Sequence, residues 1–462
     1  MKILFVKPYS LSDHIQPPLG LGFLANTVRN KNEVRIVDCL KDGIRTPLEL
    51  MEIIKKFNPE IVGLQCYTVH LRFIKELCTQ IKKFNNYISC IIGGPHPSTL
   101  PKDSLKWFGS VVDYAFCGEA EIGFPMLVER LNKDTLILSD IPGLIWRENA
   151  EINVNPVSLP ENLDNLGFPS WELLRPDKYP ESQHGAFFKK FPIAPIILTR
   201  GCPYLCTFCA GNKISGKKIR RHSIDYGIKQ IEMLYKDFGI REFHIVDDNF
   251  TFDINYAKSF LKSLIGLNLD ISWATPNGVR LDRLDIELLN LMKKSGLYLI
   301  SLGIESGSDR VLKLMQKGIT VDLIKEKVKM IRSVGIDIAG FFIIGYPGET
   351  REDIEKTISL ACSLDLIRSN FFIYLPFPGT QSYLDLVNNG ELENVNWDNF
   401  YFTSAAYVPN GFSKLEIKNY QRKAFFKFYL RPNIFLKNLM QIKSRRHFMF
   451  LFKRFYNWII SW

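Results

Sequence analysis

Three cysteines in one short run, LTRGCPYLCTFCAG, are the residues of this 462-residue chain whose spacing most clearly indicates chemistry. Cys202, Cys206 and Cys209 follow a CxxxCxxC pattern. Three thiolates at this spacing can bind three irons of a cubane [4Fe–4S] cluster, which leaves the fourth iron without a protein ligand. Cluster proteins that only carry electrons usually supply four cysteines. The spacing therefore predicts a cluster that binds an exogenous ligand.

Two other uses of these cysteines are less consistent with the sequence. A zinc site needs a fourth Cys or His nearby, usually in a second CxxC pair or an HxxxH motif. His222 is the nearest histidine downstream, and it has no partner at zinc spacing. A disulfide with one spare thiol is a poor fit, because all three cysteines lie on one short loop. The sequence therefore favours the cluster.

The cysteine run resembles the signature of the radical S-adenosylmethionine (radical SAM) superfamily, and Phe208 fits that family's aromatic preference before the last cysteine. The resemblance implies that the open iron is chelated by the amino and carboxylate groups of S-adenosylmethionine. One electron from the cluster then cleaves the sulfonium, and a 5′-deoxyadenosyl radical abstracts a hydrogen atom. It also implies an electron donor such as flavodoxin or ferredoxin. The expected substrate is a small molecule, or a lipid-like one if the C-terminal tail lies on a membrane.

Residues 191–385 alternate strand, loop and helix patterns, and several of the helices end at glycine. IILTR is the first strand, and the cysteine loop follows its carboxyl end. Chemistry in barrel-type α/β repeats is found at that end of the strands. The resemblance makes this segment a partial six-stranded (β/α) barrel.

Four further strand ends carry candidate site residues, three of them for S-adenosylmethionine. In similar proteins the end of the second strand holds the amino group, which points here to Asp248 or Asn249, although helix capping is an alternative for either. The Glu of GIES, Glu305, is expected at the ribose hydroxyls. Gly345 and Gly348, in GFFIIGYPGE, are expected to line the adenine. Arg280 ends a third strand, where it can contact a carboxylate or phosphate, cap a helix, or pair with the nearby Asp282.

Residues 1–135 also alternate strands and helices, which predicts a doubly wound parallel sheet whose ligand lies beyond the carboxyl ends of the strands. PPLGLGFLANTV, VRIVD, GGPHPS and VDYAFCGEAE resemble the cobalamin-binding domain that is fused to many radical SAM enzymes. The turns at this edge supply the candidate cobalamin-binding residues Pro18, Gly20, Thr68, Gly93, Gly94, Gly118 and Glu119.

The axial ligand of the cobalt is not evident in this half. Mutase domains carry an Asp-x-His-x-x-Gly element, and Asp13-His14 does not match it, because no glycine follows at the required distance. Radical SAM relatives commonly lack that ligand, so cobalamin stays the favoured cofactor. A flavodoxin-like domain that binds no corrin is the alternative, since a fold alone does not fix a ligand.

Composition describes an ordinary folded protein, with 46% hydrophobic and 23% charged residues. Six cysteines outside the loop are expected to be buried reduced thiols: Cys39, Cys66, Cys78, Cys90, Cys117 and Cys362. MKILFVKPYS does not read as a signal peptide, so we expect the reducing cytoplasm. Residues 136–190 have little periodicity and read as a connector.

Residues 386–462 hold the excess charge of the chain. No acidic residue follows Glu416, whereas eleven Lys and Arg do, and the net charge of the whole chain is +11. The final segment predicts an amphipathic helix, with Phe448, Leu451, Phe452, Phe455, Ile459 and Trp462 on one side. It can pack on the barrel or lie on the inner face of a membrane. Nucleic-acid binding is disfavoured, because no recognised binding module accompanies the charge.

Two hypotheses of function follow. The first is a cobalamin-dependent radical SAM enzyme that methylates a carbon atom, with oxidative cyclisation, as in the related anaerobic magnesium-protoporphyrin monomethyl ester cyclases, as the alternative outcome. The second is a non-catalytic sensor or scaffold that binds a cluster or a corrin. The intact cysteines, Glu305 and the glycine-rich fifth strand favour the first.

Overall fold

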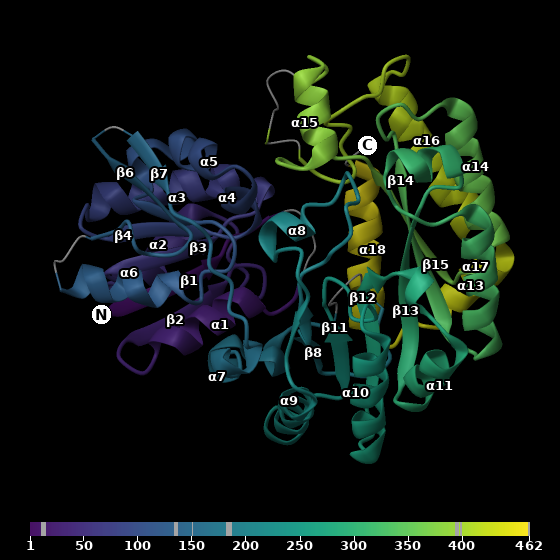
Figure 1. Cartoon of the computed structure of the whole chain (residues 1–462), viewed down its shortest axis with the longest axis horizontal. Coiled ribbons are helices and arrows are strands. Elements are labelled where there is room, and N and C mark those ends of the chain that lie inside the picture. Colours follow the sequence, from purple (N-terminus) through teal and green to yellow (C-terminus); the bar gives the residue numbers. More distant parts are fainter. Residues whose placement is uncertain are drawn as a thin grey trace.

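The computed structural model describes residues 1–10, 15–133, 137–149, 151–181, 187–392, 397 and 400–460. An N-terminal α/β domain (purple to blue) lies beside a larger α/β domain (teal to green), and the C-terminal helices follow in yellow (Figure 1). The expected α/β class, with a Rossmann-like domain followed by a partial barrel, is confirmed.

The N-terminal domain is built on a seven-stranded sheet in the order β2-β1-β3-β4-β5-β6-β7. Its strands are β1 (Lys2–Lys7), β2 (Glu33–Asp38), β3 (Ile61–Gln65), β4 (Ser89–Gly93), β5 (Tyr114–Phe116), β6 (Leu144–Glu148) and β7 (Glu151–Val154). Its helices are α1 (Leu19–Val28), α2 (Pro47–Phe57), α3 (Leu71–Phe84), α4 (Pro95–Thr99), α5 (Pro101–Phe108) and α6 (Gly123–Asn132), with short 3-10 turns η1 (Thr68–His70) and η2 (Gly109–Val111).

Both faces of this sheet are covered, which explains why its strands are almost uniformly apolar. Along β1, Ile3 and Phe5 join one hydrophobic core, whereas Leu4 and Val6 join the other. β1 to β5 are parallel, and β6 and β7 add an antiparallel hairpin after residue 135. The first sheet therefore extends into the segment 136–190 that the sequence indicated as a connector.

The second domain contains a six-stranded parallel sheet in the order β15-β14-β13-β12-β11-β8. Its strands are β8 (Ile193–Ile196), β11 (Glu242–Ile245), β12 (Ser272–Val279), β13 (Leu297–Glu305), β14 (Asp337–Ile344) and β15 (Arg368–Ile373). Its helices are α9 (Ile224–Asp237), α10 (Ile254–Gly266), α11 (Ile286–Lys294), α12 (Asp309–Leu314), α13 (Val321–Ser333), α14 (Arg351–Ser363) and α15 (Gln381–Asn388), and η5 (Leu281–Arg283) follows β12.

Side-chain caps fix where the barrel helices begin, which in turn fixes the length of the loops at the strand ends. Ser223, Asp253 and Asp285 accept hydrogen bonds from backbone N–H groups at the starts of α9, α10 and α11. Thr320 and Thr350 do the same for α13 and α14.

A small antiparallel pair brackets the cysteine loop. β9 (Thr199–Arg200) precedes the cysteines, β10 (Arg220–Arg221) follows them, and α8 (Gly211–Ile214) lies between. Figure 1 shows α8 between the two domains. The connecting segment before β8 contains η3 (Leu163–Leu166), α7 (Trp171–Leu174) and η4 (Pro176–Lys178).

Buried ion pairs join the two domains directly beside the cysteine loop. Glu119, after β5, accepts two hydrogen bonds from the Arg220 guanidinium, at 2.8 and 2.5 Å. Arg200 pairs with both Glu119, at 3.1 Å, and Glu121, at 2.7 Å. All four side chains are less than 10% exposed. Such pairs fix orientation strongly, because a partner left alone would be a buried, uncompensated charge.

Part of the C-terminal region packs on the barrel, as the plainest of the three interpretations predicts. Its helices are α16 (Lys414–Tyr429), α17 (Pro432–Leu439) and α18 (Arg445–Ile460). Ile417 and Phe428 of α16 are fully buried, whereas Phe448 and Phe452 of α18 are exposed. The side chains of Phe455, Ile459 and Trp462 lie outside the described residues.

No helix in the described part of the chain is long and apolar enough to cross a membrane. The contacts of α16 with the barrel do not support the interpretation of the tail as a membrane-surface helix.

The nine cysteines are all free thiols. Five of the six outside the loop are buried as expected, but Cys362 is only half-buried.

We expect the substitution Arg220→Met to lower the free energy of unfolding by about 3 kcal/mol, because it leaves Glu119 buried with only Arg200 as a partner. Thermal and urea unfolding of the full chain would measure the change. Arg221→Met is the matched control, since Arg221 pairs with Asp253 at the surface. Equal losses for the two variants would contradict this account of the domain contact.

Candidate active site

The cysteine loop closes back on itself, so that both of its ends lie together. The Cys202 N–H donates to the Gly216 carbonyl at 3.1 Å, and the Cys209 N–H donates to the Cys206 carbonyl at 3.1 Å. Gly201 has a φ of +97°, and a Cβ there would lie 2.4 Å from the Lys218 carbonyl oxygen, so only glycine fits. Cys202 and Cys206 are half-buried and Cys209 is exposed.

Asp247, after β11, holds the backbone that leads into this loop. Its carboxylate accepts hydrogen bonds from the Leu198 N–H at 2.7 Å and from the Thr199 N–H at 2.9 Å and hydroxyl at 2.8 Å. Burial raises the pKa of Asp247 to about 7, and these hydrogen bonds offset part of that effect. Asp247 therefore acts on the loop and is not free for a ligand.

The next two residues differ in what they leave available. Asp248 accepts from the Gly201 N–H at 3.0 Å, one residue before Cys202. Asn249 is 2% exposed, and neither its amide nitrogen nor its oxygen has a hydrogen-bond partner. Buried amides are normally paired, so an unpaired one at a strand end fits a ligand that supplies the missing partners. Helix capping does not explain these residues, because the cap of α10 is Asp253.

Glu305 ends β13 with a φ of +66°, next to an irregularity in the pairing of β13 with β14. Its carboxylate pairs with the Lys317 ammonium at 2.7 Å, and both side chains are about 10% exposed or less. A Cβ on Gly303 would lie 2.6 Å from the Glu305 oxygen and 2.7 Å from the Lys317 nitrogen, so the ion pair fills the space that glycine leaves. Strained residues that persist at a strand end are typical of ligand sites.

Lys317 is a functional candidate that the sequence did not reveal. Burial alone would lower its pKa, but the Glu305 carboxylate holds that pKa above its usual value, so the ammonium stays charged. Its nitrogen also lies 5.8 Å from the centre of the Phe208 ring. Lys317 follows α12 in the sequence MQKGIT, where a basic residue usually reads as an ordinary helix-end residue.

Arg280 is a second cation at the loop. It pairs with Asp282 at 2.8 Å, donates to the Lys317 carbonyl at 2.8 Å, and stacks on Tyr204, with its guanidinium carbon 3.5 Å from the ring centre. Another of its nitrogens lies 3.9 Å from the Cys206 sulfur. The pairing with Asp282 was one of the uses that the sequence left open, and the paired guanidinium lies beside Cys206.

Gly345 and Gly348 both have positive φ, +80° and +76°, in the turn after β14. Glu349 closes this turn by accepting from the Gly345 N–H at 2.6 Å and the Tyr346 N–H at 3.2 Å. Burial raises the pKa of Glu349 to about 8. A Cβ on Gly345 would meet Ile417 of α16, so the turn and the tail helix account for this glycine. Contact of the turn with an adenine ring stays a prediction.

In the N-terminal domain the turns after β3, β4 and β5 are tied together at one edge. Thr68 hydrogen-bonds His96 at 3.1 Å, and the Gly118 N–H donates to the Ser98 hydroxyl at 2.9 Å. Gly94 has a φ of +115°. A Cβ on it would come 3.3 Å from the Cys66 carbonyl oxygen.

Two of the predicted cobalamin positions, Gly20 and Gly93, border open space at this edge, and a third, Pro18, lies just before the helix that carries Gly20. A Cβ on Gly20 would meet no atom within 4 Å, and one on Gly93 would meet only Phe116, at 3.9 Å. Pro18 immediately precedes α1. These positions fit the approach of a large flat ligand, and Asp13 and His14 lie outside the described residues.

Two of the predicted positions have another role. Gly118 has a φ of +70°, which favours glycine, and a Cβ there would come within 2.7 Å of the Val157 side chain. Both carboxylate oxygens of Glu119 are engaged by Arg220 and Arg200. We therefore interpret Glu119 as a link between the domains and not as a cobalamin contact.

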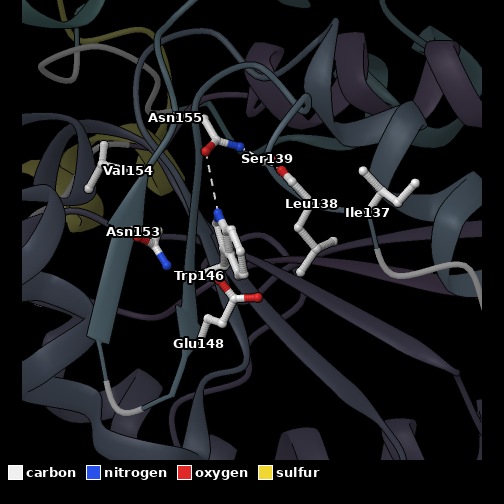
Figure 2. A pocket seen from close by; sticks show the side chains of 8 residues that line it. All are labelled: Ile137, Leu138, Ser139, Trp146, Glu148, Asn153, Val154 and Asn155. Atoms are coloured by element: carbon white, nitrogen blue, oxygen red, sulfur yellow. Dashed lines mark hydrogen bonds between the residues drawn. The ribbon is translucent and has the colours of Figure 1, made fainter.

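A hollow at the β6–β7 hairpin is separate from these residues. Figure 2 shows its lining, in which the Trp146 indole donates to Asn155 at 3.3 Å. The Asn155 amide also donates to the carbonyls of Leu138 and Ile141, so the polar groups there are structural. Among the described residues, no group of three or more His, Cys, Asp or Glu is arranged to hold a single metal ion.

Comparison with known proteins identifies the family of the chain. The family model described as "Radical SAM superfamily" matches residues 196–361, and the "B12 binding domain" matches residues 12–128. An uncharacterized methyltransferase of Pyrococcus horikoshii is 33% identical over 461 residues, covering 98% of this chain and 97% of that protein. The chain belongs to the radical SAM superfamily. It is a member of the group that carries an N-terminal B12-binding domain.

Other relatives fall in the same group. Cytidylyl-2-hydroxyethylphosphonate methyltransferase of Streptomyces wedmorensis is 29% identical, covering 84% of this chain and 82% of its own length. Anaerobic magnesium-protoporphyrin IX monomethyl ester cyclase of Rubrivivax gelatinosus is 23% identical, covering 97% and 81%.

Solved structures share the fold. The radical SAM methyltransferase TsrM of Kitasatospora setae superposes with a TM-score of 0.69 at 20% identity, over 85% of this chain and 77% of that one. The cobalamin-dependent radical enzyme OxsB superposes with a TM-score of 0.75 at 16% identity, over 100% and 71%. The family membership implies S-adenosylmethionine, a [4Fe–4S] cluster and cobalamin as the cofactors of this radical SAM enzyme.

We expect Cys206→Ala to remove the cluster, because two thiolates would remain for a site that needs three. Iron and sulfide content after anaerobic reconstitution would measure the loss. Cys362→Ala, on α14, is the control and should retain the wild-type iron content. Full iron content in Cys206→Ala would contradict the assignment of these cysteines.

We expect Lys317→Met to weaken binding of S-adenosylmethionine about tenfold or more, because Glu305 would lose its partner and be buried as an unpaired charge. Equilibrium dialysis with cluster-loaded protein would measure the dissociation constant, and Lys317→Arg should recover part of the affinity. Lys313→Met removes an exposed lysine of α12 and should have no effect. Wild-type affinity in Lys317→Met would show that the ion pair does not support the ligand.

Proposed function

We propose that this radical SAM protein is a cobalamin-dependent enzyme that methylates a carbon atom of a small-molecule substrate. The observation that carries the proposal is the link between Glu119 and Arg220, which joins the edge of the B12-binding domain to the strand that follows the cysteine loop. Because both cofactor positions border this link, a substrate between the domains would reach both.

The cofactors supply the reactive chemistry when bound: S-adenosylmethionine with the cluster provides methyl groups and a hydrogen-abstracting radical, and cobalamin carries the methyl group. The residues of the chain hold these cofactors in position. Cys202, Cys206 and Cys209 hold the cluster, and Asn249 or Asp248 binds the amino group of S-adenosylmethionine.

The remaining contacts with S-adenosylmethionine come from three elements. Glu305, oriented by Lys317, accepts from the ribose hydroxyls, a use that suits an ionised carboxylate. Phe208 and the turn containing Gly345 and Gly348 line the rest of the ligand.

For cobalamin we propose the edge formed by Pro18, Gly20, Thr68, Gly93 and Gly94. The support is the open space at Gly20 and Gly93 and the position of all these turns beyond the carboxyl ends of parallel strands. Oxidative cyclisation is the second candidate outcome, since the matched cyclase covers nearly the whole chain.

The experiment uses anaerobically reconstituted full-length protein supplied with cobalamin, dithionite and S-adenosylmethionine. We expect cobalamin to stay bound through gel filtration with its corrin absorbance, and 5′-deoxyadenosine to form. Formation of 5′-deoxyadenosine without corrin binding would refute methyl transfer and leave radical chemistry standing. No 5′-deoxyadenosine despite full cluster occupancy would refute the enzyme and favour the sensor.

A further inference from the structure

Two glutamines of the N-terminal domain each carry a buried side-chain oxygen without a hydrogen-bond partner. They are Gln16, in the segment between β1 and α1, and Gln65, the last residue of β3. A buried acceptor that receives no hydrogen bond is unfavourable unless something else supplies the donor. Other buried polar atoms of the described chain also lack partners, so the position of these two decides what they indicate.

Both oxygens lie at the point of the first sheet where the order of its strands reverses. In the order β2-β1-β3-β4-β5 this point is the gap between β1 and β3. The ammonium of Lys7, the last residue of β1, donates to the Gln16 carbonyl at 2.8 Å, which places Gln16 beside the end of β1. Gln65 stands at the end of β3, on the other side of the gap. Ligands of open α/β sheets bind in the crevice at such a switch point.

The backbone of Gln65 is held in place beside open space. Nδ1 of the buried His70 lies 3.1 Å from the Gln65 carbonyl oxygen. In the register of β3 and β4, Gln65 is the partner of Gly93. A Cβ on Gly93 would meet only Phe116, at 3.9 Å. The Gln65 side chain is therefore fixed at its base and adjoins room for a ligand.

The unpaired groups are acceptors, and this limits the kind of ligand that they suit. An anionic phosphate, such as that of a flavin mononucleotide, would set oxygen against oxygen. The nearby Lys7 does not offset this, because its ammonium is already paired with the buried Asp38 at 3.0 Å. A corrin ring carries neutral amide side chains whose NH₂ groups donate hydrogen bonds. The two glutamines therefore match a corrin better than the ligand of a flavodoxin-like domain.

We propose that the side-chain oxygens of Gln16 and Gln65 accept hydrogen bonds from amide side chains of the corrin ring, one from each side of the crevice between β1 and β3. Neither residue is among the cobalamin positions that the sequence indicated. The inference rests on the proposed function, since it requires cobalamin at this edge, and it adds the groups that recognise the periphery of the ring.

The test measures corrinoid affinity and the stability of the cofactor-free full chain for Gln16→Met and Gln65→Met, which keep the size of the side chain and remove the amide. By equilibrium dialysis we expect each variant to bind cobalamin about fivefold or more weakly. The same factor is expected for cobinamide, which keeps the corrin amides and lacks the nucleotide. In urea, the cofactor-free variants should be at least as stable as wild type, because the unpaired acceptor is gone.

The matched control is Gln80→Met. Gln80 is a half-buried residue in the later part of α3, which runs away from the carboxyl ends of the strands, and this variant should keep the wild-type affinity. Wild-type cobalamin affinity in both test variants would overturn the proposal. So would a loss that disappears with cobinamide, which would place the contact on the nucleotide, or a loss matched by an equal loss of stability in the cofactor-free protein.

If a methionine variant fails to fold, Gln16→Asn or Gln65→Asn replaces it and withdraws the oxygen by one methylene group. A smaller loss of affinity is then expected, and unchanged affinity again overturns the proposal. Wild-type protein that binds neither corrinoid would instead refute cobalamin as the cofactor in the proposed function.

Discussion

The backbone leading into Cys202 is held by two adjacent carboxylates of a different strand, and the rest of the site depends on this contact. Asp247 binds the N–H groups of Leu198 and Thr199, and Asp248 binds that of Gly201. The hydrogen bonds within the loop close it, as from the Cys202 N–H to the Gly216 carbonyl, but its position relative to the barrel comes from these contacts with Asp247 and Asp248. The carboxyl end of β11 supplies that position, and it also places the unpaired Asn249 beside the loop.

Charge arrangement then separates the two sides of the loop. On the side of the barrel, Lys317 pairs with Glu305 and Arg280 pairs with Asp282. Each pair is neutral as a whole, and its carboxylate holds the cation in place. Toward the B12-binding domain, Glu119 joins Arg220 and Arg200. Buried pairs of this kind contribute orientation more than stability. The loop is thus fixed from three elements that are far apart in the sequence.

Local sequence patterns were enough to predict those parts of the structure that are determined by residues close together in the chain. Alternating strand and helix patterns predicted both sheets. The CxxxCxxC spacing identified the family, because its chemistry needs three ligands on one loop. The roles of the other site residues remain predictions.

Contacts between distant segments could not be read in the same way. Nothing near Lys317 in the sequence indicates that it meets Glu305, which lies on the other side of helix α12 in the chain. GEAE suggested a ligand contact for Glu119, where the structure has an ion pair. The β6–β7 hairpin was missed because its short strands alternate weakly and follow Pro and Asn residues. In each case the partner lies elsewhere in the chain, and a local pattern carries no information about it.

The central claim is that Cys202, Cys206 and Cys209 hold a cluster with one iron open to S-adenosylmethionine. Electron paramagnetic resonance of the reduced, reconstituted protein tests it most directly, with spectra recorded before and after S-adenosylmethionine is added. The account predicts one cluster signal that changes its shape and g-values on addition, because the ligand binds an iron directly. A fully loaded cluster whose spectrum does not respond to saturating S-adenosylmethionine would contradict it.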